Sequence, residues 1–264
     1  VLTSSLGVLL KNAGYSISVM KLDPYLNVDP GTMSPLEHGE VFVTADGAET
    51  DLDLGHYERN LQIKLTRESS VSSGQVFKKI LDDERAGLFL GKCIQLVSQT
   101  ACGTKRRLLD FAVKNNSDFV LLEIGGTIGD MEGKAFLEAV RQLRLAFKKS
   151  NLMYHAHLSY VPFLAWTGEI KTKPTQHSVN ALKKSGLVPD ALFLRAVKEI
   201  SPRTIKKLTL LCGVEHIFQV LTFNPIYNLF LDLERQKVGL KVQEYFGITM
   251  TRQSDLSEWK QLID

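Results

Sequence analysis

The chain has 264 residues, of which 44% are hydrophobic and 23% are charged, and its formal net charge at pH 7 is +3. A chain of this size can bury a full hydrophobic core, and we predict a single domain over residues 1–264. The small charge does not favour a nucleic-acid partner, three scattered cysteines are too few for a disulfide framework or a zinc site, and the absence of a long apolar run or a signal peptide predicts a cytoplasmic protein without a membrane partner.

Helical and extended patterns alternate along the chain. Helices are predicted at residues 2–12, 74–86, 104–114, 134–149, 176–185 and 203–211, followed by a terminal helical region. Strands are predicted at residues 16–22, 119–124, 155–161, 191–195 and 217–221. This alternation predicts an α/β fold, with a mostly parallel sheet and helices on both faces, of the Rossmann-like kind related to P-loop NTPases.

The first candidate site residue is Lys21, at the end of the first predicted strand. The loop over residues 21–35 contains three prolines and one glycine, which restrict its backbone. Open α/β sheets bind ligands at the carboxyl ends of their strands, so Lys21 could reach a phosphate group. The alternative is an ordinary surface lysine.

Two aspartates in residues 49–59 form the second candidate. If this segment is extended, Asp51 and Asp53 share one face. Paired carboxylates suit Mg²⁺, which takes oxygen ligands and shares them with substrate phosphates. A polar turn with exposed acids is the alternative.

An apolar run that ends in an acid and two glycines is the third candidate. Residues 119–124 have the pattern of a buried parallel strand, which would bring Glu123 to the edge of the sheet. Such an acid can hold Mg²⁺ in phosphate-transfer enzymes, and Gly125 and Gly126 allow close approach of backbone amides. A structural pair between Glu123 and a lysine or arginine is the alternative; a cation is expected in either case.

Two histidines share a face of the predicted strand at residues 155–161. His155 and His157 could be interpreted as a metal-binding pair. We favour a structural role for both, because no third ligand stands near them in the sequence.

The fourth candidate is the lysine segment, residues 171–176. It combines two ammonium groups, two hydroxyls, a proline and an amide: Lys171, Thr172, Lys173, Pro174, Thr175 and Gln176. We predict a phosphate-binding loop that leads into a helix at residue 176, because helix N-termini favour anions, and the expected ligand is a nucleotide. A solvated lysine face is the alternative.

These stretches, in this order, resemble the synthetase (amidoligase) domain of the CTP synthase family. The resemblance rests on residues 21–35, 38–43, 49–59, 123–130 and 168–179, and weaker similarity covers nearly the whole chain. It implies ATP-dependent amination: ATP phosphorylates the 4-oxygen of UTP, ammonia displaces the phosphate, and CTP results. It also implies Mg²⁺, a homotetramer, inhibition by CTP, and ammonia supplied by a glutaminase domain.

The resemblance further implies roles for individual residues. Lys21, close to the transferring phosphate, and His38, inside a matched motif, are the candidate catalytic residues. Asp53 and Glu123 are similar to the Mg²⁺ ligands, and Asp53 and Arg195 are candidates for the ATP site. The candidates for the UTP and CTP site are the six residues of the lysine segment together with Lys207, Asp130, Met131 and Glu132.

The sequence also departs from the family. The family's glycine-rich phosphate loop, which ends Gly-Lys-Gly, and its glutaminase half have no counterpart in these 264 residues. Ser98 and Gln99 stand where the family has Pro-His, an acid near residues 222–225 is missing, and Trp166 stands where a smaller residue is expected. These departures keep an alternative open, in which the chain is a non-catalytic UTP/CTP-binding or assembly module.

Overall fold

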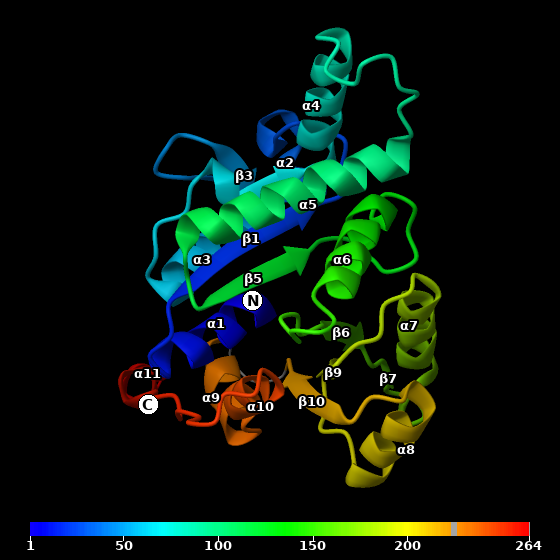
Figure 1. Cartoon of the computed structure of the whole chain (residues 1–264). Helices are drawn as coiled ribbons and strands as arrows, with labels where there is room; N and C mark the ends of the chain where they lie inside the picture. The colour runs from blue at the N-terminus through cyan, green and yellow to red at the C-terminus, as the bar shows by residue number, and fades with distance from the viewer. Residues whose placement is uncertain (223–225, 264) are drawn as a thin grey trace. The chain divides into compact units, whose positions relative to one another are not determined.

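The chain folds into two compact units. Figure 1 shows the computed structural model, which describes residues 1–222 and 226–263. The first unit contains Val1, Thr3 and residues 15–143, and the second contains Leu2, residues 4–14 and residues 144–264. The prediction of one domain over residues 1–264 stays a prediction. The departure noted at residues 222–225 falls mainly on residues 223–225, outside the described residues.

A parallel sheet forms the centre of the first unit. The strand order is β4-β1-β5, from β4 (Ser70–Ser72), β1 (Ile17–Asp23) and β5 (Phe119–Ile124). Strand β1 is buried from its second residue to its last, as expected for the middle strand of a parallel sheet. In the register of β1 and β5, Lys21 lies opposite Glu123. The two candidate residues are therefore direct neighbours at the carboxyl end of the sheet.

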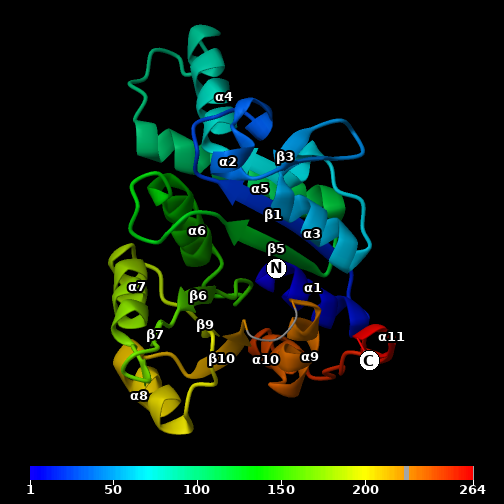
Figure 2. The same ribbon diagram turned by 180° about the vertical axis from the view of Figure 1, so that it is seen from behind.

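Helices and one small hairpin complete the first unit. Helix α5 crosses in front of β1 in Figure 1, and α3 lies before the sheet when it is seen from behind in Figure 2. The helices are α2 (Pro35–His38), α3 (Leu52–Leu61), α4 (Ser73–Arg85), α5 (Leu96–Asn115) and most of α6 (Lys134–Ala146), with 3-10 turns η1 (Pro30–Thr32) and η2 (Arg67–Ser69). Strands β2 (Val41–Val43) and β3 (Glu49–Asp51) form an antiparallel hairpin.

The second unit has its own parallel sheet, of order β10-β9-β6. Its strands are β6 (Ala156–Tyr160), β9 (Ala191–Ala196) and β10 (His216–Leu221), and β7 (Phe163–Leu164) pairs with β8 (Glu169–Ile170) in a separate hairpin. Figure 1 shows α7 (Lys173–Lys184) and α8 (Pro202–Cys212) in yellow on one side of these strands, and α9 (Leu229–Arg235) and α10 (Val238–Tyr245) in orange on the other. Val179, Leu192 and Leu208 lie in the core between α7, β9 and α8.

The first and last helices of the chain belong to the second unit. Helix α1 (Leu2–Asn12) contacts the segment before α11 (Ser257–Ile263), while η3 (Ile226–Asn228) precedes α9. The Ser254 hydroxyl donates to the Leu9 carbonyl at 2.7 Å, and the Asp255 amide donates to the Asn12 carbonyl at 3.2 Å. The Leu9 carbonyl also accepts from the Ala13 amide at 3.1 Å, so these bonds add to the local ones and tie the segment before α11 to the end of α1.

The structure confirms the predicted fold class, because parallel sheets flanked by helices are typical of Rossmann-like nucleotide-binding folds. The predicted helix at residues 2–12 and strand at 119–124 match α1 and β5 in both bounds. The helix predicted at 104–114 was too short, since α5 begins at Leu96. The hydroxyls of Thr100 and Thr104 donate to carbonyls four residues earlier, which keeps these threonines compatible with a helix. Among the described residues, no helix combines the length and the apolar character needed to cross a bilayer.

Candidate functional site

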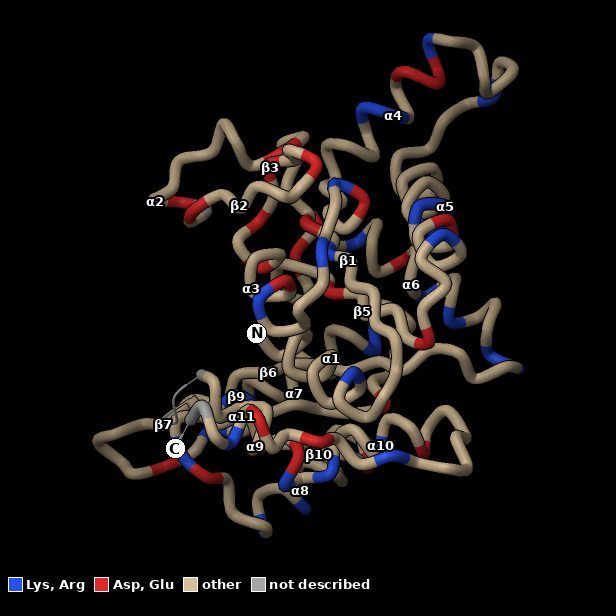
Figure 3. The backbone as a smooth tube through the Cα atoms, turned by 90° about the vertical axis from the view of Figure 1, so that its left-hand side faces the viewer, with Lys and Arg blue, Asp and Glu red and all other residues tan. Residues whose placement is uncertain are grey.

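A buried lysine surrounded by acids lies at the carboxyl edge of the first unit's sheet. The distances from Lys21 Nζ are 3.6 Å to Asp23 Oδ1, 3.7 Å to Asp51 Oδ1 and 3.7 Å to Glu123 Oε1. The same ammonium group donates a short hydrogen bond to Asp53 Oδ2. We call these five residues the lysine–carboxylate cluster. Figure 3 shows several acidic positions, in red, in the region of β3 and α3.

Strand geometry explains the positions of three members of the lysine–carboxylate cluster, Lys21, Asp23 and Glu123. Lys21 and Asp23 are two residues apart on β1, so their side chains share one face of the strand. Glu123 comes from β5, opposite Lys21 in the register. The prediction placed Lys21 and Glu123 at the same edge of a parallel sheet, and the structure brings them together there.

The other two members, Asp51 and Asp53, come from a helix N-terminus, where the sequence analysis considered an extended segment or a polar turn. Only Asp51 is in a strand; it ends β3 and is the N-cap of α3, and its Oδ1 accepts from the Asp53 amide at 2.8 Å. Asp53 lies in the first turn of α3. An aspartate followed by a helix-compatible run favours a cap, because the side chain satisfies a free amide and the helix dipole favours its negative charge. The condition of an extended segment is therefore met only as far as Asp51, although both carboxylates lie close to Lys21.

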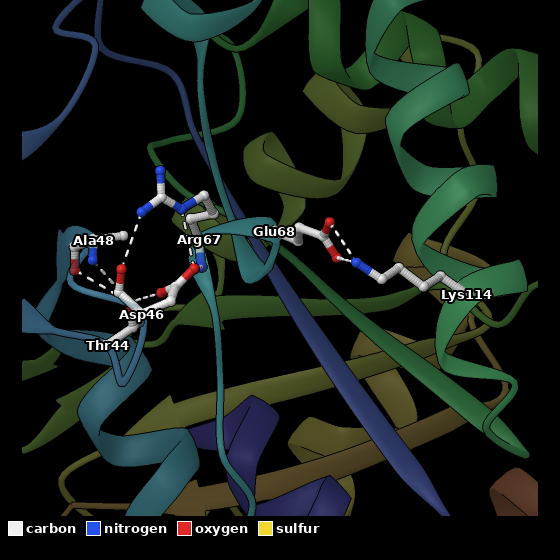
Figure 4. Close-up of polar contacts among 6 residues, drawn as sticks. All are labelled: Thr44, Asp46, Ala48, Arg67, Glu68 and Lys114. Atoms are coloured by element: carbon white, nitrogen blue, oxygen red, sulfur yellow. Dashed lines mark hydrogen bonds and ion pairs between the residues drawn. The ribbon is translucent and has the colours of Figure 1, made fainter.

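Polar contacts hold the hairpin that precedes α3. In Figure 4 the Thr44 hydroxyl donates to the Asp46 carboxylate at 2.6 Å. Arg67 donates twice to the same residue, from Nε to Oδ2 and from Nη2 to the main-chain carbonyl, both at 3.0 Å. The hydrogen bond from Thr44, followed by those from Arg67, lowers the pKa of Asp46 to about 2. Beside this contact, Glu68 pairs with Lys114 at 2.7 Å. The contacts of Asp46 hold the turn between β2 and β3, which precedes the strand that ends in Asp51.

Burial and charge act against each other in the lysine–carboxylate cluster. Burial alone would lower the pKa of Lys21, but the surrounding carboxylates outweigh it and raise that pKa above its ordinary value. Burial raises the pKa of Asp23 to about 7, in spite of the nearby ammonium. For Asp53 burial also acts to raise the pKa, but Lys21 outweighs it and the pKa lies below the usual range. Four acids thus share one buried cation.

Tyr57 is a further member of this site that the sequence reasoning missed. Its hydroxyl donates to Glu123 Oε2 at 2.6 Å, and the residue is fully buried. Burial, together with the charge of Glu123, raises the pKa of Tyr57 far above its ordinary value, so the phenol remains a donor. The signal was present in the sequence: Tyr57 stands four residues after Asp53, which places both on one face of a helix. Asp23, two residues after Lys21, was missed in the same way.

The donor chemistry of the lysine–carboxylate cluster fits a magnesium ion. Asp53 and Glu123 supply carboxylate oxygens, the ligands that Mg²⁺ prefers, and Asp23 Oδ2 is buried with no hydrogen-bond partner among the described residues. No group of three or more His, Cys, Asp or Glu residues in the described part of the chain is spaced to hold a metal. Mg²⁺ usually takes one or two protein carboxylates with waters and substrate phosphates, so a two-carboxylate site stays a prediction.

The lysine segment lies in the second unit, and its loop part is shorter than predicted. Helix α7 begins at Lys173 rather than at residue 176, with Thr172 at the N-cap position and Pro174 in the first turn. Proline is favoured there because the first helical amides have no partner within the helix. Residues 173–176 therefore belong to the first turn of a helix, in which Pro174 has no amide hydrogen and the Gln176 amide donates to the Thr172 carbonyl at 3.1 Å.

The polar groups of the lysine segment divide into exposed and buried ones. Lys171 and Lys173 are exposed, and Lys171 pairs with Glu169 at 2.5 Å. Thr175 is fully buried and accepts a hydrogen bond from the Ser159 hydroxyl of β6 at 3.1 Å. Gln176 donates to the Thr172 hydroxyl at 3.1 Å. The hydroxyls thus anchor the helix start, while the ammonium groups face solvent.

The remaining predicted residues lie in several places. Asp130, Met131 and Glu132 are exposed in the turn between β5 and α6, in the first unit. Lys207 is exposed on α8 and Arg195 is exposed on β9, both in the second unit. A ligand shared by the turn and the lysine segment stays a prediction, as does the role of His38, which ends α2.

His157 on β6 and His155 just before this strand both have contacts within the second unit. His157 Nε2 lies 2.8 Å from the Ser178 hydroxyl of α7. Burial, with smaller contributions from His157 and Arg144, lowers the pKa of His155 to about 4. Asp190 forms a two-bond pair with Arg144, at 2.7 and 2.8 Å, and accepts from the His155 amide at 2.7 Å. The His155 ring is therefore neutral near pH 7.

Comparison with known proteins identifies the family. The family model described as CTP synthase N-terminus matches residues 1–248. The chain is 46% identical over 265 residues to a CTP synthase of Onion yellows phytoplasma (strain OY-M), covering 100% of the chain and 49% of the relative. It is 47% identical over 266 residues to a CTP synthase of Dehalococcoides mccartyi (strain ATCC BAA-2266 / KCTC 15142 / 195), covering 100% and 48%. The chain spans about half the length of these relatives. The chain therefore belongs to the CTP synthase family and matches the N-terminal part of its members.

Proposed function

We propose that this chain carries the site at which UTP is aminated to CTP with consumption of ATP. The observation that supports the proposal most is the lysine–carboxylate cluster, with Lys21 held among four acids at the carboxyl edge of a parallel sheet. Phosphoryl transfer requires positioned charges more than covalent participation by the protein, and this cluster offers both signs of charge in one buried place.

In the proposed reaction, the 4-oxygen of UTP takes the terminal phosphoryl group of ATP, and ADP leaves. Ammonia then adds at C4, the ring carbon that bears this oxygen. The carbon–oxygen bond breaks, inorganic phosphate departs with the oxygen, and the nitrogen loses a proton to become the amino group of CTP. Asp53 and Glu123 would hold Mg²⁺, which neutralises phosphate charge when bound. Lys21 supplies a positive charge for the transferred group, and Tyr57 orients Glu123 through its 2.6 Å hydrogen bond.

The phosphates of UTP, and of the product CTP acting as an inhibitor, are proposed to bind at the lysine segment. Lys171 and Lys173 are exposed cations at the N-terminus of α7, a helix of 12 residues. By family relationship we also propose a cytoplasmic homotetramer that receives ammonia from a glutaminase domain. Size-exclusion chromatography with light scattering tests the tetramer.

The test of the proposed function is CTP formation from UTP, ATP, Mg²⁺ and ammonium chloride, followed by chromatography of the nucleotides. Free ammonia removes the need for a glutaminase domain. Asp53→Asn should lower the rate at least about 100-fold, as loss of a charge-stabilising group does in other enzymes. Asp82→Asn, which changes an exposed carboxylate on α4 paired with Lys78 at 2.9 Å, is the matched control and should stay near the wild-type rate.

Two results would count against the proposal. Equal rates for Asp53→Asn and wild type would remove the lysine–carboxylate cluster from the reaction. CTP binding by calorimetry without any turnover would instead support the alternative, a UTP/CTP-binding or assembly module.

A further inference from the structure

A short hairpin leads directly into the lysine segment. Strands β7 and β8 pair Phe163 with Ile170 and Leu164 with Glu169. The pairing continues to the lysine segment, because the Lys171 amide donates to the Pro162 carbonyl at 2.9 Å. Residues 165–168 form the tip of this hairpin. Lys171 and the hairpin tip therefore belong to one continuous, hydrogen-bonded piece of structure.

The base of the hairpin is fixed on one face. Ile170 packs against the core cluster of the second unit. Phe163, its partner, has the Lys198 ammonium 4.1 Å from its ring centroid, a cation–π distance. Because neighbouring residues of a strand point to opposite faces, Leu164, Glu169 and Lys171 lie on the other face. The ion pair between Glu169 and Lys171 agrees with this arrangement.

The tip of the hairpin holds an exposed tryptophan. The Trp166 side chain is 83% exposed. The other tryptophan, Trp259, packs on Phe230 with ring centroids 4.7 Å apart, as is usual for so large an apolar ring. An exposed indole offers a flat stacking surface for another aromatic ring.

Spacing along the hairpin suggests which ligand could use both groups. Leu164 pairs with Glu169, and Lys171 follows Glu169 by two residues. Trp166 lies in the turn, two residues after Leu164. At about 3.3 Å per residue, Trp166 and Lys171 are separated by no more than about 13 Å along the hairpin. A ligand that contacts both Trp166 and Lys171 needs an aromatic group and an anionic group joined by a spacer. A nucleotide has this layout, with its base, sugar and phosphates.

We propose that Trp166 stacks on the pyrimidine ring of the nucleotide whose phosphates bind at the lysine segment. This inference rests on the proposed function and adds a base-binding residue to it. Stacking recognises the face of a ring and requires no hydrogen-bond partner, so Trp166 contributes affinity to UTP and CTP alike.

The test compares three ligands, UTP, CTP and inorganic tripolyphosphate, by titration calorimetry on the chain. Trp166→Ala should weaken UTP and CTP about 5- to 150-fold, the range that follows from base–aromatic stacking of about 1–3 kcal/mol. It should leave tripolyphosphate unchanged, since that ligand has no ring. Trp166→Phe, which keeps an aromatic face, should recover most of the lost nucleotide affinity.

Tryptophan fluorescence supplies an independent measurement. UTP should quench the emission of wild type and of Trp259→Phe, which retains Trp166, and should leave the emission of Trp166→Phe unchanged. Quenching that persists in Trp166→Phe would overturn the inference, because the ring would then contact another part of the chain.

The two proposals fail in different ways. Equal nucleotide affinity in Trp166→Ala and wild type, or equal weakening of all three ligands, overturns the stacking role alone. Lys171→Ala should weaken all three ligands. If it leaves tripolyphosphate and nucleotides unchanged, the phosphate site at the lysine segment, and with it this part of the proposed function, is wrong.

Discussion

The lysine–carboxylate cluster and the lysine segment use the same cation in opposite ways. Lys21 has 5% of its side chain exposed and lies near four acids, whereas Lys171 has 47% exposed and pairs with one exposed acid. A buried ammonium must be compensated inside the protein, so it is fixed in place. An exposed ion pair costs little to open, so its lysine can exchange one anion for another. The comparison distinguishes the fixed charge of Lys21 from the exposed charge of Lys171, which we propose to bind phosphate.

The largest effect is expected from removing the buried cation. Lys21→Met keeps a side chain of similar length but leaves the neighbouring carboxylates without their ammonium group. Breaking a buried ion pair in this way destabilises proteins by about 3–5 kcal/mol, and we expect a loss of that size in the free energy of unfolding measured with urea. Lys241→Ala, which breaks an exposed pair with Glu244, is the control and should change it by less than about 1 kcal/mol. Similar losses in the two variants would contradict the distinction.

A second prediction concerns how stability depends on pH through His155, a base whose neighbouring carboxylate is already paired. The Nδ1 atom of His155 is buried without a hydrogen-bond partner among the described residues, and Asp190, the nearby carboxylate, is already paired with Arg144. The pKa of His155 is about 4 in the folded chain, below the ordinary value of 6.5. Between these values the unfolded chain binds more protons, so the stabilising contribution is present above pH 6.5 and is lost as the pH falls toward 4.

The measurement is the free energy of unfolding of wild type and His155→Gln between pH 7 and pH 4. Wild type should lose about 1–3 kcal/mol more than the variant over this range. Parallel curves would mean that His155 is protonated without cost in the folded chain, and the contrast with Lys21 would no longer hold.

The smallest effect on stability, with a large effect on binding, is expected at Lys171. Lys171→Ala removes an exposed ion pair, so the free energy of unfolding should change by less than about 1 kcal/mol. Its affinity for UTP or CTP should fall by about tenfold or more, because a charge-assisted contact to phosphate is lost. Calorimetry and urea unfolding of one preparation measure both. Unchanged affinity would remove Lys171 from the nucleotide site.

The sequence predicted the parts of the site that depend on strand ends. Lys21 and Glu123 follow apolar runs, and the carboxyl ends of parallel strands meet at one edge, so their proximity could be inferred. Local spacing puts Asp23 on the face of Lys21 and Tyr57 on the face of Asp53, but the bond from Tyr57 to Glu123 spans 66 residues and depends on where α3 lies against β5. A short polar segment such as 49–59 is compatible with a turn, a strand or a helix start, and the capping hydrogen bond of Asp51 decides among them.

The start of α7 was misplaced for a similar reason. Two threonines and a proline look like a loop in sequence, yet Pro174 is allowed in a first helical turn and Thr175 bonds to Ser159 of β6. The buried partner is 16 residues away, so the helical state of this turn is decided by tertiary contacts. The exposed position of Trp166 likewise follows from the hairpin pairing of β7 and β8, which is too short to leave a sequence pattern.

The pairing of Lys21 with Glu123 across β1 and β5 also bears on which strand register the chain adopts when it folds. Side chains alternate between the faces of a strand, so a one-residue slip of β5 would turn Glu123 to the opposite side of the sheet. The slipped sheet would bury Lys21 without one of its acids and would separate Tyr57 from its acceptor. Apolar neighbours such as Val120 and Leu121 would tolerate the shift far better. The polar residues that we propose for catalysis therefore also help to specify the register of β1 and β5, because the shifted pairing would be less stable than the native one.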